Sequence, residues 1–319
     1  MHEERYSALR IARCNRHLFM ALALIVVATT ACASNPASRR ARAISDADKS
    51  AKSALARENE LDAGKIPART LAVLPFSVAD RDTLLRPLGF GLADLLMGDL
   101  SRSPEVRLVE RIQTNAMLKE LNMVDEGVTD PRTAPRVGKL LGARRLLFGS
   151  ASLVGGNTVR LDARLVDVIA GTVADVVSAT APLDRVIEAE KALALLLFER
   201  LGITLTPAQR AAVEQRQTTQ LGALVAYGRG VEAEARGDAA GATAAFEEAS
   251  RLDAAFSMAR TQASGTASTT QRASSVARVT ELATQAVNAT APVRVAEAAD
   301  APLASGSTIA IIFTIRVTP

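Results

Sequence analysis

Histidine, cysteine and tryptophan are scarce in this chain, and their scarcity excludes most enzyme chemistry. The 319 residues include two histidines, two cysteines and no tryptophan. His2, His17 and Cys14 lie in the first 31 residues, which we interpret below as a cleaved signal. The remaining chain then has no histidine and one cysteine. This excludes a Ser-His-Asp triad, a Cys-His pair, zinc sites built on His or Cys and an internal disulfide. We therefore predict a non-enzymatic protein without cofactor or metal.

The charge balance argues against a nucleic-acid partner. The full chain carries +4. Residues 1–31 contain four arginines and two acidic residues, so the remaining chain carries +2. Nucleic-acid binding calls for a basic stripe, usually with aromatic side chains for base stacking. Aromatic residues make up only 3% of the chain, so we predict no binding to nucleic acid.

An apolar run over residues 18–28 follows three arginines and ends shortly before Cys32. The run is shorter than the roughly 20 residues that a membrane-spanning helix needs, and it is typical of a secretory signal. The small residues before Cys32 resemble a bacterial lipobox, although Thr29 stands where leucine is usual. We predict a signal peptide over residues 1–31 and lipidation of Cys32.

The product of this processing would be a lipid-anchored protein. An acylated cysteine with two or more chains anchors stably in a membrane. Ala33 follows the cysteine in place of aspartate, which favours the outer membrane, on its periplasmic side. Ordinary cleavage at the Ala31-Cys32-Ala33 pattern is the alternative, and it would release a soluble periplasmic protein.

Two segments with little apolar periodicity flank the part expected to fold. Residues 32–65 are rich in Ala, Ser and Arg, and we expect a lipid-anchored tether there, with at most a transient helix near residues 51–61. Residues 261–319 are expected to be a low-complexity tail. The tail ends in a strongly β-prone stretch, residues 308–317, which would have to pair with a sheet edge or with a partner.

Residues 66–202 alternate between strand and helix signals. Continuous apolar character at residues 70–76 indicates a strand buried on both faces. Residues 159–165 alternate apolar with charged side chains, which indicates a strand with one wet face. Asp130 and Pro131 are expected to open a helix. Further strands are expected at 106–109, 144–149 and 172–180, and helices at 84–100, 111–121 and 183–201. This order predicts an α/β domain with a mixed sheet covered by helices.

Residues 203–260 predict a small helical region. Thr206 and Gln209 form a capping-box pattern around Pro207 at the first helical position. Gly237-Asp238 is expected to be the turn of a helical hairpin.

Several charged or glycine-rich positions could be functional sites or could have an ordinary structural role. Residues 89–91, Gly-Phe-Gly, lack the rest of a phosphate-binding loop, so a tight entry to a packed helix is favoured. Asp162 alternates with apolar residues and is expected to form surface ion pairs rather than an acid/base or calcium site. Lys139 and Lys191 are expected to be solvated.

Residues 70–180 resemble the domain shared by the curli-assembly lipoprotein family CsgG and its FlgO-like and TolB N-terminal-like relatives. The resemblance is carried by an ordered series of short motifs: Leu71-Ala72-Val73-Leu74-Pro75-Phe76, Gly89-Phe90-Gly91-Leu92-Ala93-Asp94, Leu108-Val109-Glu110-Arg111, Leu147-Phe148-Gly149 and Leu161-Asp162-Ala163-Arg164-Leu165. It implies a CsgG/TolB-N-like fold. The family's membrane-spanning hairpins have no inserted counterpart here, and residues 157–180 look like soluble sheet.

Residues 226–256 resemble one tetratricopeptide repeat. The matching positions include Tyr227, Gly230, Ala242, Phe246 and Ala249. Ala254 stands where proline is usual, and no second copy is visible, although such repeats need about three copies to bury a core. These five residues are the candidate partner-binding residues. Residues 237–241 with Phe246 would form a peptide groove in one reading, whereas packing inside the helix pair is the favoured reading.

Together the resemblances imply a non-enzymatic outer-membrane lipoprotein that faces the periplasm. It would act through self-association, as a homo-oligomer, and through protein partners of the cell envelope or a secretion apparatus, as in curli-type assembly and transport. The alternative is a TolB-like periplasmic scaffold or sensor that binds an envelope protein without forming a pore. An enzyme that hydrolyses glycans with two carboxylates is a third hypothesis.

Overall fold

The computed structural model describes residues 35–78, 85–124 and 130–265, so Cys32 and the β-prone stretch 308–317 lie outside the described residues. The fold is built on a six-stranded sheet in the order β3-β1-β4-β5-β6, with β2 also paired to β4. β1 runs parallel to β3 and β4, whereas β4, β5 and β6 form an antiparallel meander. The predicted mixed sheet is confirmed. Its strands are β1 (Thr70–Val73), β2 (Ser77–Val78), β3 (Arg107–Leu108), β4 (Arg145–Val154), β5 (Thr158–Asp167) and β6 (Thr172–Pro182).

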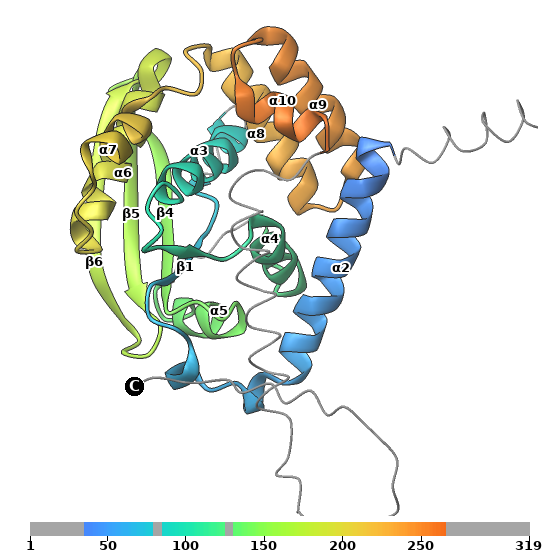
Figure 1. Cartoon of the computed structure of the whole chain (residues 1–319), viewed down its shortest axis with the longest axis vertical. Helices are drawn as coiled ribbons and strands as arrows, with labels where there is room; N and C mark the ends of the chain where they lie inside the picture. Colours follow the sequence, from blue (N-terminus) through green and yellow to red (C-terminus); the bar gives the residue numbers. More distant parts are fainter. Residues whose placement is uncertain (1–34, 79–84, 125–129, 266–319) are drawn as a thin grey trace, which may run out of the picture. The chain divides into compact units, whose positions relative to one another are not determined.

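Helices pack on both faces of the central strands of this sheet (Figure 1). They are α2 (Pro36–Ala56), α3 (Leu85–Leu100), α4 (Arg111–Glu120), α5 (Ala134–Leu140), α6 (Val186–Arg200), α7 (Pro207–Glu214), α8 (Leu221–Ala235), α9 (Ala239–Leu252) and α10 (Ser257–Ala263). Short 3₁₀ turns occur at Glu58–Glu60, Ala63–Lys65 and Leu183–Arg185. Within the described ranges, none of the helices combines the length and the apolar character needed to cross a membrane.

Alternation along the strands divides the core into two faces. Leu71, Val73 and Leu147 pack on one face with α3 and α6, whereas Ala72 and Leu146 pack on the other with α4 and α5. The central strands β1 and β4 are therefore covered on both sides, as the apolar run at 70–76 predicts. A third cluster joins α2 to α4 and α5, so α2 forms a layer outside α4 (Figure 1).

The antiparallel meander has one buried and one polar face. Leu161 and Leu165 in β5 are at most 1% exposed and pack in the cluster that includes α3 and α6. On the opposite face Asp162 pairs with Arg160 at 3.0 Å and accepts a hydrogen bond from Ser178 on β6. The ion pair of Asp162 thus lies within β5, whereas a cross-strand pair was expected, and the apolar face of residues 157–180 is buried inside the protein.

The helix expected to open at Asp130 begins four residues later. Asp130 accepts hydrogen bonds from the backbone N–H of Arg132 at 2.9 Å, and its carbonyl accepts one from Thr133 at 3.0 Å. These bonds close a turn, and α5 starts at Ala134 with Pro135 in its first turn. The expectation failed because aspartate followed by proline suits a turn as well as a helix cap.

The tether expected over residues 32–65 is corrected by α2. Residues 36–56 form one continuous helix, capped by the Asn35 side chain, which accepts from the Ala37 N–H. Ile44, Ala47 and Ala51 are buried against α4, α5 and the start of α9. The small buried residues give a weak periodic signal, which explains why the sequence looked like a spacer.

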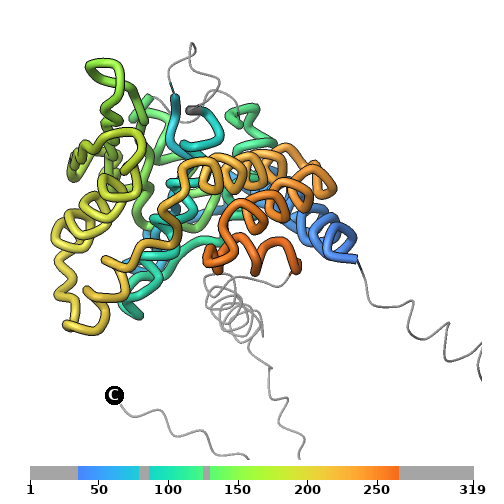
Figure 2. Tube along the Cα trace, turned by 90° about the horizontal axis from the view of Figure 1, so that it is seen from above, coloured from blue at the N-terminus to red at the C-terminus, as the bar shows by residue number. Residues whose placement is uncertain are grey.

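The helical region 203–260 shares a core with the α/β domain. The capping box at Thr206 and the turn at Gly237 are both confirmed, the latter with φ +88°. Figure 2 shows α8 and α9 lying side by side. Buried residues of α8 and α9 belong to the same hydrophobic cluster as α3 and the sheet. The expected boundary near residue 203 therefore separates no independent core.

Glycines allow α3 and α8 to come very close. A Cβ added to Gly228 would lie 1.8 Å from the carbonyl oxygen of Pro87, and one added to Gly91 would lie 3.3 Å from the Gly228 Cα. Gly91 therefore serves helix packing. This agrees with the interpretation of residues 89–91 as a tight entry to a packed helix.

We expect Gly228→Ala to push α8 away from α3 because the new methyl group meets backbone, which cannot yield. Overpacking of this kind costs about 2 kcal/mol or more in the free energy of unfolding. Gly222→Ala on the same helix is the control, since its added Cβ meets only Leu252 Cδ1 at 4.0 Å. Urea unfolding of both variants measures the difference. Equal stabilities would contradict the close contact.

Candidate functional site

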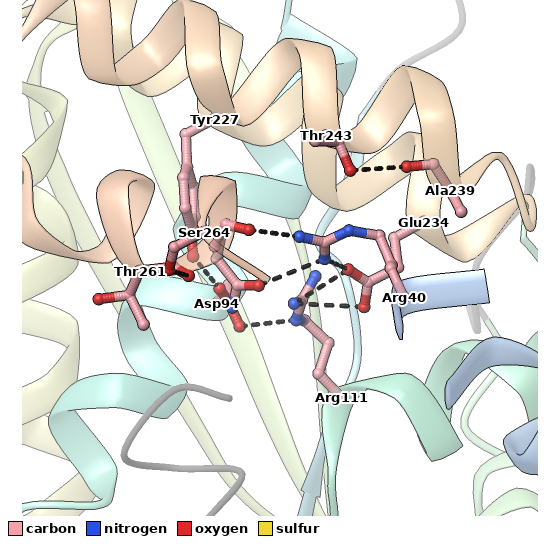
Figure 3. A network of polar contacts seen from close by, with 10 residues as sticks. Arg40, Asp94, Arg111, Tyr227, Glu234, Ala239, Thr243, Thr261 and Ser264 are labelled. Carbon is pink, nitrogen blue, oxygen red and sulfur yellow. Dashed lines mark hydrogen bonds and ion pairs between the residues drawn. The ribbon is translucent and has the colours of Figure 1, made fainter. Parts of the chain in front are cut away.

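Four charged side chains from four helices meet in the interior beside α2 (Figure 3). They are Arg40 of α2, Asp94 of α3, Arg111 of α4 and Glu234 of α8, and their side chains are between 1% and 10% exposed. Two positive and two negative groups balance in charge. Such a set is stable in the interior because each ion has partners of opposite sign.

Arg40 makes the contacts that hold α2. Its guanidinium forms an ion pair with Glu234 and donates hydrogen bonds to the carbonyl oxygen of Gln262 at 2.5 Å and to its side-chain oxygen at 3.3 Å. The guanidinium also stacks over the Phe246 ring, 4.7 Å from its centre. One side chain of α2 thus binds α8, α9 and α10 together.

Arg111 links the same carboxylate to the α/β domain. Its Nε lies 3.0 Å from Asp94 Oδ1, and its Nη2 lies 3.3 Å from Glu234 Oε1. Burial lowers the pKa of Arg111, but the charges of Asp94 and Glu234 outweigh burial and raise it above its ordinary value. Tyr227 donates a hydrogen bond to Asp94, and burial together with that carboxylate raises the pKa of the phenol. Tyr227 is therefore a neutral donor in this network.

A second buried group of charges lies between α3 and α6. Lys191 Nζ is 2.5 Å from Asp99 Oδ2 and 3.3 Å from Glu190 Oε2. The side chains of Lys191, Asp99 and Glu190 are at most 8% exposed, so the expectation that Lys191 is solvated is wrong. Burial raises the pKa of Glu190 well above its ordinary value, and Asp99 raises it further. Lys139, by contrast, is partly exposed and donates to the Glu58 carbonyl oxygen at 3.1 Å.

The arrangement of these groups suits holding helices together more than it suits chemistry on a substrate. Within residues 35–78, 85–124 and 130–265 no group of three or more His, Cys, Asp or Glu side chains could hold a metal ion. A hollow of about 110 Å³ is lined by Asp184 and Glu188. It is well below the roughly 300 Å³ of a small-molecule site. Glu188 is also paired with Arg185 at 3.6 Å and Arg216 at 3.5 Å. The two-carboxylate glycan hypothesis therefore finds no support there.

The five residues expected to form a partner groove are inside the protein. Tyr227, Ala242, Phe246 and Ala249 are 0% exposed, and Gly230 is buried where an added Cβ would meet the Phe246 ring at 2.6 Å. Tyr227 and Phe246 rings pack with centroids 5.2 Å apart. The expectation that these five residues bind a partner is corrected: their side chains form the interior of the helix pair.

Sequence reasoning missed the charged network because its members look like surface residues. Arg40 lies in the supposed tether, and Asp94 lies off the leucine stripe of its helix. One signal was available in α8, which is apolar on nearly every side from Leu221 to Val231. A glutamate such as Glu234 on a buried helix requires a basic partner, although the sequence does not say which one.

We expect Arg40→Ala to loosen α2 from the rest of the protein. The substitution leaves Asp94 and Glu234 with only Arg111 to balance them, so a net negative charge stays buried, and it should lower the free energy of unfolding by about 3 kcal/mol. Relative to the parent protein, amide hydrogen exchange in the variant should speed up in α2 much more than in β4 and β5. Arg42→Ala, two residues along the same helix at an exposed position, is the control. Unchanged exchange in α2 would show that the Arg40 contacts do not hold this helix in place.

Glu190→Gln should stabilise the protein at neutral pH. The unfolded chain releases the Glu190 proton near its ordinary pKa of 4.5, whereas the folded chain keeps it to higher pH. Stability therefore falls as the pH rises above about 4.5. We expect the variant to be about 1 kcal/mol or more stable than the parent at pH 7 and equal to it near pH 4. Thermal unfolding at both pH values measures this, with the half-exposed Glu188→Gln as control. A parent more stable than the variant at pH 7 would refute the assignment.

Comparison with known proteins finds a family match for part of this chain. Residues 68–158 match the family described as curli production assembly/transport component CsgG. The C-terminal domain of LpoB from Salmonella enterica is 17% identical, covers 43% of this chain and 98% of its own, and has a TM-score of 0.30. The same domain from Escherichia coli is 18% identical, with 43% and 98% covered and a TM-score of 0.30.

No curated protein matches the chain by sequence. The family match begins just before β1 and ends at the start of β5, so it does not test the tetratricopeptide resemblance at residues 226–256. Over residues 68–158 the chain is similar to the CsgG family, as the motifs predict.

Proposed function

We propose that this protein is a non-enzymatic lipoprotein of the outer membrane, facing the periplasm and anchored through Cys32. It acts by binding protein partners of the cell envelope or of a secretion apparatus and by self-association. The observation that carries the proposal is the match of residues 68–158 to a family of assembly and transport components. The signal-like run before Cys32 supports the location.

The described residues favour binding over catalysis. Asp99, Glu190 and Tyr227, the acids and the tyrosine whose pKa is raised among the described residues, lie between helices and are at most 1% exposed. A catalytic acid or base must be within hydrogen-bond reach of a substrate proton. These groups instead reach the side chains of neighbouring helices.

The outer edge of β6 is the surface that best supports self-association. In the described part of the chain, β6 pairs only with β5, so its other edge has no strand beside it. Val173 and Val176 on this strand are 38% and 54% exposed, and Ile169 in the preceding turn is 44% exposed. An eleven-residue edge strand with apolar side chains and no lysine is a ready template for pairing with a second copy.

The alternative is a TolB-like scaffold or sensor that binds an envelope protein without forming a pore. The burial of the apolar face of β5 and β6 in the cluster that includes α6 favours it, because that face is already occupied in the folded chain. In this alternative the β6 edge would bind a different protein, and the chain would stay monomeric.

We expect Cys32→Ala to move the protein from the membrane fraction to the soluble periplasmic fraction because the acyl chains are lost. Its melting temperature should stay the same. Cys14→Ala is the matched control: it removes the other cysteine, inside the predicted signal, and should leave the protein in the membrane. Retention of the Cys32 variant in washed membranes would refute the anchor.

Val176→Lys should reduce the mass of the detergent-extracted protein measured by light scattering, because a lysine on the edge opposes strand pairing. Val154→Lys is the control, because Val154 is 49% exposed on β4, about 20 Å from Val176 along the strands. A parent protein that is already monomeric would reject self-association and favour the scaffold.

A further inference from the structure

The point at which α2 begins is the point at which a Cys32 anchor would join the folded protein. Asn35 caps the helix, so only three residue steps separate it from Cys32. Three steps span about 10 Å at full extension. A flexible tether over the whole of residues 32–65 would instead give a separation of about 30 Å.

The first turn of α2 is fixed to the rest of the protein, so it adds no flexible length between Cys32 and the fold. Arg39 Nη2 donates to the Ser264 carbonyl oxygen at 2.7 Å, and Arg40 carries the buried contacts to Glu234 and Gln262. A Cβ added to Gly265 would lie 2.9 Å from the Pro36 Cα. The start of α2 and the end of α10 therefore lie against each other, and we call this the α2–α10 corner.

The α2–α10 corner is basic. Residues 36–45 contain Arg39, Arg40 and Arg42 and no acidic residue, and α10 contains Arg260 and no acidic residue. Arg40 is buried in its ion pair, whereas Arg39, Arg42 and Arg260 are exposed. The opposite end of the helix is mixed in charge, with Glu58, Glu60 and Asp62 close to Arg57 and Lys65.

We propose that the α2–α10 corner rests on the anionic phospholipid surface to which Cys32 is attached, and that α2 is a rigid mount in place of a tether. This inference rests on the lipid anchor of the proposed function. The span from Cys32 to Asn35 is at most about 10 Å, which is short enough for the α2–α10 corner to touch the headgroups, and in contact the attraction between its arginines and anionic lipid is not screened out. On a tether three times longer the same charges would have little effect.

The mount also sets how the rest of the protein is presented. α2 rises about 30 Å over its 21 residues, so its far end would be held away from the corner. A protein fixed in this way offers the same surfaces to periplasmic partners at all times, whereas a tethered one would tumble.

The test uses the full-length lipidated protein in vesicles of phosphatidylethanolamine with one quarter phosphatidylglycerol and a headgroup nitroxide quencher. Because Cys32 is acylated, Ser38→Cys or Asn59→Cys provides a single thiol for a fluorophore, at exposed positions near the corner and beyond the far end of α2. We expect quenching at residue 38 to exceed that at residue 59 by threefold or more. Equal quenching at the two positions would overturn the mount.

Charge reversal separates the corner from the anchor. Arg42→Glu, alone and with Arg39→Glu, should lower quenching at residue 38 toward the level at residue 59, and replacement of phosphatidylglycerol by phosphatidylcholine should do the same. Arg57→Glu with Lys65→Glu is the control, with the same charge change at the far end, and should have no effect. If neither reversal nor neutral lipid changes the quenching, the basic corner does not contact lipid.

Flotation of the same vesicles tests the proposed function by itself. A protein that does not float with the lipid is not anchored, and that outcome refutes the lipoprotein proposal. A protein that floats and shows equal quenching at the two positions keeps the anchor and refutes only the mount.

Discussion

Arg40 and Glu234 lie 194 residues apart in the sequence and form an ion pair in the interior. Arg111 shares the Glu234 carboxylate and passes the contact on to Asp94. Together these four side chains join α2, α8, α4 and α3. Burying either ion alone would cost several kcal/mol. This cost makes the position of α2 depend on the hairpin α8–α9, and the hairpin depend on the α/β domain.

The close approach of α3 and α8 completes this dependence. Gly228 and Gly91 let the two helix backbones meet, and Tyr227 beside them donates to Asp94. A single helical hairpin cannot bury enough apolar surface to be stable alone. Here its core residues join the cluster of the sheet and α6. The part similar to the CsgG family and the helical hairpin α8–α9 thus share one hydrophobic core.

This coupling changes what a lipid anchor would do. An anchor on a free spacer only keeps a protein near a membrane, whereas an anchor three residues before a clamped helix also orients it. The two buried groups of charged side chains hold different helices in place. The Arg40 group holds α2 against α8, whereas Lys191, Asp99 and Glu190 hold α6 on α3 and so hold the covered face of the meander.

The local chemistry of the residues determined most elements of this protein. The apolar run at 70–76, the alternation at 159–165, the capping box at Thr206 and the turn at Gly237 all predicted structure correctly, because each depends on neighbours in the chain. The CsgG-like motifs likewise pointed to the family that matches residues 68–158.

Only the tertiary structure decided that α2 is docked, that Lys191 is buried and that Phe246 is inside. Each depends on partners far away in the sequence, such as Glu234 for Arg40 and Asp99 for Lys191. A charged residue looks the same in a sequence whether water or a distant opposite charge surrounds it. The free energy that separates the two cases comes from burial, which exists only once the chain has folded.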